Sequence, residues 1–166
     1  MSVLTSIPIL LILLILQSTL ASKVTLLNGA VDLILVWLAA WGLNSKDRSG
    51  YILALISGAL VAYVTALPWY VYLSAYISVT IFARFVFRKL WESPLLAMLA
   101  ITMVSSIFLY LITFVSLRIN GTDYSLTESL NQVIIPSIFL NLFVAIPVYA
   151  IVKDFSRWIY RSEETA

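Results

Sequence analysis

The amino-acid sequence predicts an all-α integral membrane protein: six transmembrane helices in a single domain, with N- and C-termini cytoplasmic. The first observation is composition, since the 166 residues are 62% hydrophobic and 11% charged, with a mean hydropathy of +1.03. Soluble domains usually have about 45–50% apolar and about 25% charged residues. The second is a set of six long apolar runs. The third is a strong asymmetry in where Lys and Arg fall.

The six apolar runs define the expected spans. A helix needs roughly 20 mainly apolar residues to cross about 30 Å of hydrocarbon. Each run is continuous rather than alternating, which argues against a lipid-facing barrel. The expected spans lie at roughly 3–21, 27–43, 50–67, 68–88, 94–117 and 132–152.

Turn and capping residues separate these runs. Residues 44–50 form a polar, charged break, and Pro68 and Pro94 each stand where a proline suits a first helical position. Residues 120–123 have the composition of a turn. Ser125 then precedes an acidic first turn, which is typical of a helix start. We find no internal repeat and no linker, so residues 1–166 are expected to form one domain.

Basic residues give the expected orientation, because cytoplasmic loops retain them. Eight of the ten basic residues fall on the side that holds the loop between the second and third runs, the loop between the fourth and fifth runs, and the C-terminus. Only Lys23 and Arg118 fall on the opposite side. Residues 153–166 are expected to be a basic cytoplasmic extension that rests on anionic headgroups or docks a partner. The predicted cytoplasmic basic residues are Lys46, Arg48, Arg84, Arg88, Lys89, Lys153, Arg157 and Arg161.

Polar residues inside apolar runs are candidate functional residues, because they are costly in lipid. Asp32 near the start of the second run has two interpretations. It is either a proton or cation site or partner-facing anchor, or an interfacial carboxylate at a helix N-terminus, paired with Lys23. Gln17 and Asn141 are expected to hydrogen-bond between helices or to line a polar pocket.

Two prolines flank Asn141 in the sixth run. Pro136 and Pro147 predict a kinked or locally unwound helix whose freed carbonyls need other partners. Such helices line transport sites in some proteins, although proline is also ordinary in membrane helices.

Small residues recur every four positions in the third run, at Ala54, Gly58, Ala62 and Ala66. This spacing lets two helix backbones approach closely. The neighbouring helix belongs to this chain, to a second copy in a homodimer, or to another protein, and the sequence leaves all three open. Ser74 and Ser78 on the fourth run are candidates for the complementary face.

The chain contains no Cys and no His. This excludes disulfide scaffolds, the usual Cys/His metal and haem sites, and any nucleophile–His pair. No glycine-rich phosphate loop is present. We therefore expect no catalytic residues, no metal, no cofactor and no nucleic-acid partner, and we predict a protein that is not an enzyme.

Several short motifs resemble the MreD family of bacterial rod shape-determining membrane proteins. They are Gln17-Ser18-Thr19 ending the first helix, Asp32 leading an aliphatic run, and Gly50-Tyr51 starting the third. The basic end of the fourth helix, from Arg84 to Leu90, and the sixth helix around Asn141 also match. The chain departs from the family in having Ala30-Val31 before the acid and no acidic residue in the third helix.

The resemblance implies a scaffold of the bacterial elongation complex in the inner, cytoplasmic membrane. It implies that the chain binds an MreC-like bitopic protein and helps position an MreB-like filament and peptidoglycan synthases, namely a SEDS glycosyltransferase with its class B transpeptidase. It also implies a six-helix fold shared with the substrate-binding subunits of energy-coupling-factor transporters.

The sequence is also compatible with two other functions. One is a small-molecule, vitamin-type binding subunit of a transporter with an outward pocket, although residues 11–16 lack the alanine motif of such subunits. The other is a subunit of a larger respiratory or transport complex.

Overall fold

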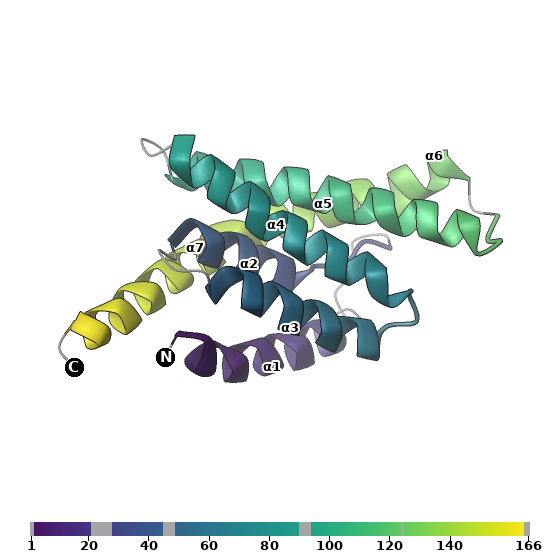
Figure 1. Ribbon diagram of the computed structural model, residues 1–166. Coiled ribbons are helices and arrows are strands. Elements are labelled where there is room, and N and C mark those ends of the chain that lie inside the picture. The colour runs from purple at the N-terminus through teal and green to yellow at the C-terminus, as the bar shows by residue number, and fades with distance from the viewer. Residues whose placement is uncertain (1, 21–27, 45–48, 90–93, 124, 165–166) are drawn as a thin grey trace.

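The computed structural model describes residues 2–20, 28–44, 49–89, 94–123 and 125–164 of the chain, and these residues fold almost entirely into helices (Figure 1). The last three elements follow one another without a break, so that they act as one long helix. The elements are α1 (Ser2–Leu20), α2 (Leu33–Asn44), α3 (Ser49–Val64), α4 (Trp69–Lys89), α5 (Pro94–Ile119), α6 (Leu126–Ser129), the π-helical η1 (Leu130–Ile134) and α7 (Ile135–Glu164).

The short helix α2 lies at the centre of the molecule. It contacts α1, α3, α4, α5 and α7, and every residue from Leu33 to Leu43 is buried. A helix that is apolar all round belongs in such a position. Trp37 and Trp41 stack with ring centroids 5.3 Å apart, and the Trp41 indole N–H donates to Ser49 Oγ at 3.1 Å. The core therefore forms around α2, and the longer helices surround it.

The outer surface of this bundle is apolar. Large hydrophobic side chains are exposed on α1, α3, α4, α5 and α7. Trp69–Val86, Pro94–Ile119 and the continuous Leu126–Ile159 are long and apolar enough to cross a membrane. The apolar helices α2 and α3 are shorter, at 12 and 16 residues. The length and composition of the three long helices indicate a membrane protein.

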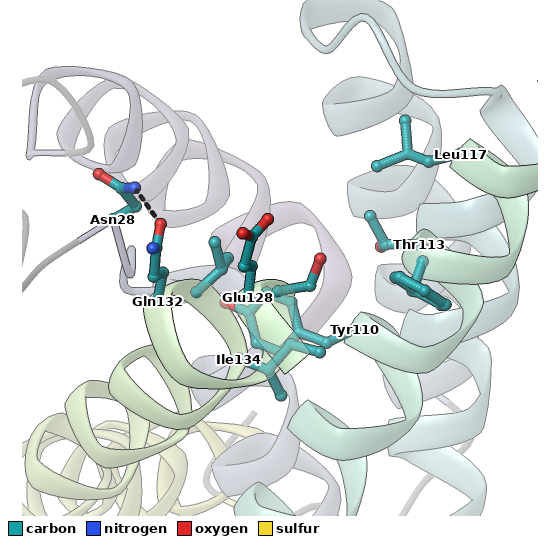
Figure 2. A pocket seen from close by; sticks show the side chains of 10 residues that line it. Asn28, Tyr110, Thr113, Leu117, Glu128, Gln132 and Ile134 are labelled. Carbon is teal, nitrogen blue, oxygen red and sulfur yellow. Dashed lines mark hydrogen bonds between the residues drawn. The ribbon is translucent and has the colours of Figure 1, made fainter. Parts of the chain in front are cut away.

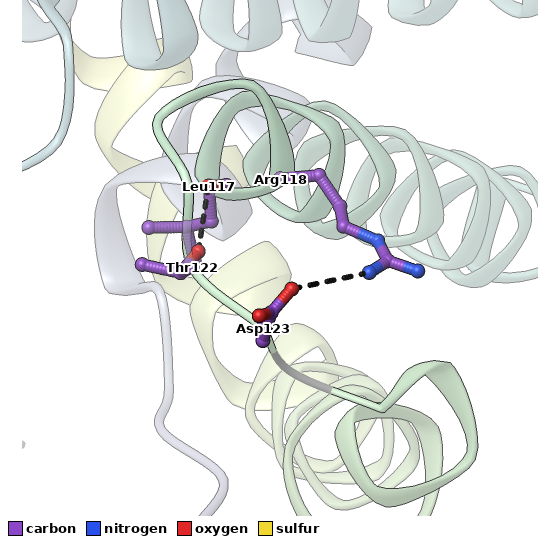
Figure 3. Close-up of polar contacts among 4 residues, drawn as sticks. All are labelled: Leu117, Arg118, Thr122 and Asp123. Atoms are coloured by element: carbon purple, nitrogen blue, oxygen red, sulfur yellow. Dashed lines mark hydrogen bonds and ion pairs between the residues drawn. The ribbon is translucent and has the colours of Figure 1, made fainter.

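The expected ends of the third, fourth and fifth helices lie close to the observed ones. The turn after α5 also forms as the sequence indicates (Figure 3). Gly121 has a φ of +84°, Thr122 N–H donates to Leu117 C=O, and Gly121 N–H donates to Arg118 C=O, both at 3.1 Å. This is a Schellman motif. Beside this motif, Arg118 Nη1 and Asp123 Oδ1 form an ion pair with 3.9 Å between the two atoms. Ser125 Oγ then accepts from Glu128 N–H and caps α6.

Two expected elements differ from the structure. The second helix starts at Leu33 rather than near residue 27, because Asp32 caps it and residues 28–32 have no helical structure. The sixth helix runs from 126 to 164 rather than from 132 to 152, because its first turns continue through η1. The expected extension after 152 is therefore, as far as Glu164, a continuation of α7.

The two prolines of the last helix behave differently. The π-helical turn η1 ends two residues before Pro136, and π-helical turns are frequent at functional sites. Pro136 has no N–H for the Gln132 carbonyl, and this carbonyl accepts from Asn28 N–H at 3.1 Å instead. At Pro147 α7 stays helical, so the expected local unwinding does not occur there.

Candidate functional site

A cluster of polar side chains fills the space at the start of α2. We call Gln17, Asp32, Tyr76, Ser106 and Asn141 the central polar cluster. They come from α1, the start of α2, α4, α5 and α7 respectively. The cluster therefore joins five helices at one point inside an otherwise apolar bundle.

Asp32 is the centre of this cluster and is only 4% exposed. Its carboxylate accepts from Leu35 N–H at 2.9 Å, which is the bond of an N-cap residue. The Tyr76 hydroxyl donates to both carboxylate oxygens, at 3.0 and 3.1 Å. These bonds offset part of the cost of burying a carboxylate away from water.

Amide side chains from the first and last helices complete the cluster. Asn141 Oδ1 accepts from Asp32 N–H at 2.8 Å, and Asn141 Nδ2 donates to Ser106 Oγ at 2.9 Å. Gln17 Oε1 accepts from Ile34 N–H at 3.3 Å. The free N–H groups at the start of α2 thus receive acceptors from α1 and α7 as well as from Asp32.

The segment 28–32 leads into this cluster and is held against α5, η1 and α7. Ala30 N–H donates to Ser137 Oγ at 3.0 Å, and the Tyr110 hydroxyl donates to Ala30 C=O at 3.2 Å. A Cβ on Gly29 would lie 2.8 Å from both Pro136 Cβ and Ser137 N, so the chain passes very close to the helix here. Non-helical backbone inside a membrane protein requires such partners.

The structure brings together three residues that the sequence singles out, Gln17, Asp32 and Asn141. All three hydrogen-bond between helices, in line with one of the two interpretations of the amides. Asp32 caps a helix, as one of its two interpretations expects, and it is buried in the bundle beside Tyr76 and Asn141. The expected pairing with Lys23 lies outside the described residues. Among the described residues, no group of three or more His, Cys, Asp or Glu could hold a metal ion.

Tyr76, Ser106, Ser137 and Tyr110 are partners that the sequence does not reveal. Serine and tyrosine are ordinary in apolar helices, and nothing in their local sequence marks these four. Ser106 and Asn141 are 35 residues apart, and Asp32 and Asn141 are 109. Only the packing of distant helices makes them a site.

The small-residue stripe of α3 packs, in its first half, against α4 of the same chain. Ala54 and Gly58 are buried, and a Cβ on Gly58 would lie 3.0 Å from Leu73 Cα. Ala62 is half-buried, and Ala66 is exposed beyond the end of α3. Ser74 and Ser78 donate to carbonyls of their own helix, at 2.6 and 2.7 Å. The stripe is therefore buried at Ala54 and Gly58, and α4 lies against it at Gly58.

Three of the predicted basic residues, Arg84, Lys153 and Arg157, are described, and they lie toward the end of the bundle where α4 and α7 finish. Arg84 is half-buried, and its Cζ lies 4.6 Å from the centroid of the Tyr51 ring. Lys153 is half-buried and Arg157 is exposed on α7. The side chains of Arg88, Lys89 and Arg161, and residues 45–48, are outside the described part of the structure.

A pocket of about 350 Å³ opens at the opposite end, between α5 and the α6–η1 segment (Figure 2). Asn28 Nδ2 donates to Gln132 Oε1 at 3.4 Å on one wall. Thr113 and Leu117 of α5 face these residues across the pocket, and the Glu128 carboxylate points into the opening. The lining thus combines amide, carboxylate and hydroxyl groups with apolar side chains.

A second hollow, of about 590 Å³, is an apolar groove between α5 and α7. The small side chain of Ala100 lines it on α5. Phe139 and Phe143 line it on α7, and their side chains are 69% and 79% exposed. We call it the α5/α7 groove. It is lined by Leu96, Leu99, Ala100, Met103, Phe139, Leu142, Phe143 and Ile146.

Comparison with known proteins gives no match: no family model, no curated protein and no solved structure is similar to this chain.

Proposed function

We propose that this chain is a six-span, non-enzymatic adaptor of the MreD type in the bacterial cytoplasmic membrane. In this role it binds the single transmembrane helix of an MreC-like protein and thereby helps position an MreB-like filament and the peptidoglycan synthases. The proposal draws on the sequence resemblance around Asp32 and Asn141 and on one surface feature, the α5/α7 groove.

Helix directions and lengths support six crossings. Successive helices run in alternating directions when the short α2 is counted and α6 to α7 are taken as one helix, and α1 begins at the end of the bundle where α7 finishes (Figure 1). The 12 residues of α2 span only about 18 Å. Residues 28–32 add up to about 16 Å if extended. Together they reach about 34 Å, enough for the hydrocarbon core.

The α5/α7 groove is the observation that carries the adaptor proposal. All eight lining residues are apolar, as the groove of a lipid-embedded helix partner requires. Association of helices in lipid depends on close van der Waals packing, and Ala100 permits close approach at the groove floor. The small residues Ala54 and Gly58 cannot serve this purpose, because both are buried and Gly58 packs against Leu73 of α4.

Co-purification with an MreC-like partner tests this proposal. Ala100→Phe fills the groove and should reduce partner retention by about tenfold or more, the equivalent of roughly 1.4 kcal/mol. Ala150→Phe is the matched control, since Ala150 is also exposed, lies on α7 and does not line the groove. Equal retention by both variants, each folded, would contradict the adaptor proposal.

The pocket beside η1 favours a second candidate function, the binding of a small polar molecule. Its volume of about 350 Å³ lies at the low end of the range for ligand pockets, roughly 300–1,000 Å³. Native mass spectrometry of protein purified from its host would detect a retained ligand. Thr113→Trp would then abolish retention by filling the pocket, whereas Ala100→Phe would not.

A further inference from the structure

Arg84 combines a charge with unsatisfied hydrogen-bond donors. Its Nε and Nη2 atoms are buried and have no hydrogen-bond partner in the part of the chain that the structure describes. The Tyr51 ring covers one face of the guanidinium, with 4.6 Å between Cζ and the ring centroid. The cation–π contact holds the group in place but satisfies none of its N–H donors.

An unpaired guanidinium in this position is costly. Buried charges in proteins are paired or hydrogen-bonded, and ionisable groups in membrane helices usually mark a binding function. Arg84 therefore needs an anionic partner, and the described residues do not supply one.

The two free nitrogens define the shape of that partner. Nε and Nη2 form one edge of the planar guanidinium, and their N–H bonds run parallel. This edge matches two oxygens held by a single atom, as in a phosphate or carboxylate group. Arg84 is half-buried rather than enclosed, so part of its side chain lies at the surface of the bundle.

We propose that Arg84 binds the phosphodiester group of an anionic phospholipid. It lies five residues before the end of α4, at the end of the bundle that also carries Lys153 and Arg157. Lipid headgroups lie at this level of a spanning helix, and basic pockets between helices attract anionic ones. Arg88 follows four residues later on α4. This binding is independent of the adaptor function.

The wild-type protein in detergent provides the first test. Titration with phosphatidylglycerol should raise its unfolding temperature, because a ligand that binds only the folded state stabilises it. Phosphatidylcholine, whose choline group offsets the phosphate charge, and inorganic phosphate should raise it much less. If phosphatidylglycerol gives no larger shift than phosphatidylcholine, the proposal is wrong. That outcome favours the carboxylate of a protein partner.

Substitutions at Arg84 and Arg157 test whether the lipid binds at Arg84. Arg84→Met should be at least as stable as wild type without lipid, because it removes an unpaired charge, and should gain nothing from phosphatidylglycerol. Arg157→Met, an exposed control on α7, should keep the wild-type response. Equal losses in both variants would mean diffuse attraction and would overturn the assignment to Arg84.

A conservative variant covers the case in which Arg84→Met does not fold. Arg84→Lys keeps the charge but lacks the paired edge, so it should bind phosphatidylglycerol about tenfold less tightly than wild type by native mass spectrometry. Unchanged affinity in Arg84→Lys would refute binding through the Nε–Nη2 edge.

Discussion

The interior around α2 and the outward face of α5 and α7 use side chains in opposite ways. At the start of α2, Asp32 and Asn141 form hydrogen bonds that link distant helices. In the α5/α7 groove every lining side chain is apolar. Apolar contact alone gives little preference for protein over lipid. Polar hydrogen bonds therefore link the helices of the interior, and in the proposed adaptor function the α5/α7 groove would bind its partner by close packing alone.

Asp32→Ala should have the largest effect on the interior. It leaves Tyr76 Oη and Leu35 N–H without their acceptor and removes the cap of α2. Each unsatisfied buried group costs about 1–3 kcal/mol, so we expect a loss of about 4 kcal/mol in the free energy of unfolding. Denaturant titration in mixed micelles, followed by circular dichroism, measures it.

Asp32→Asn sharpens this prediction because it keeps an acceptor oxygen of the same size. It should recover at least half of the lost stability. If Asp32→Ala and Asp32→Asn were equally stable, and both resembled wild type, the carboxylate would not hold the interior together.

Gly58→Leu should have the next largest effect, about 1–3 kcal/mol, because its side chain must displace the α4 backbone at Leu73. Ala59→Leu is the control, since Ala59 is exposed on the same helix, and should change stability by less than about 0.5 kcal/mol. Thermal unfolding of both variants in one detergent makes the comparison. Equal unfolding temperatures would mean that α3 and α4 are not closely packed at Gly58.

Ser106→Ala should have the smallest effect of the three. It removes the acceptor of Asn141 Nδ2 but leaves the bond from Asp32 N–H to Asn141 Oδ1. Hydrogen bonds between membrane helices average about 0.6 kcal/mol in double-mutant cycles. A cycle with Asn141→Ala measures the coupling directly, and a coupling of zero would remove Ser106 from the cluster.

The sequence predicts those parts of the molecule that depend on local residues. Pro94 starts α5, Gly121 supplies the positive φ of the turn after it, and Ser125 caps α6, because each acts on its own few residues. The late start of α2 is different. The non-helical path of 28–32 depends on acceptors at Gln132 and Ser137 more than 100 residues away, which no local pattern shows.

The same limit applies to the candidate sites. Gln17, Asp32 and Asn141 are conspicuous because they are polar in apolar runs, so the sequence identifies them one by one. Their common position depends on how α1, α2 and α7 pack together. The α5/α7 groove has no comparable signal, because Ala100 and Phe143 are ordinary residues of apolar helices and only their juxtaposition forms a groove.

Site-specific photo-crosslinking in native membranes tests the central claim most directly. A photoreactive residue at Phe143, in the groove, should crosslink to the MreC-like protein within its transmembrane segment. The same residue at Leu55, which is also apolar and exposed but lies on α3, should not. Crosslinks to that protein from Leu55 alone, or from neither position, would contradict a partner helix in the α5/α7 groove.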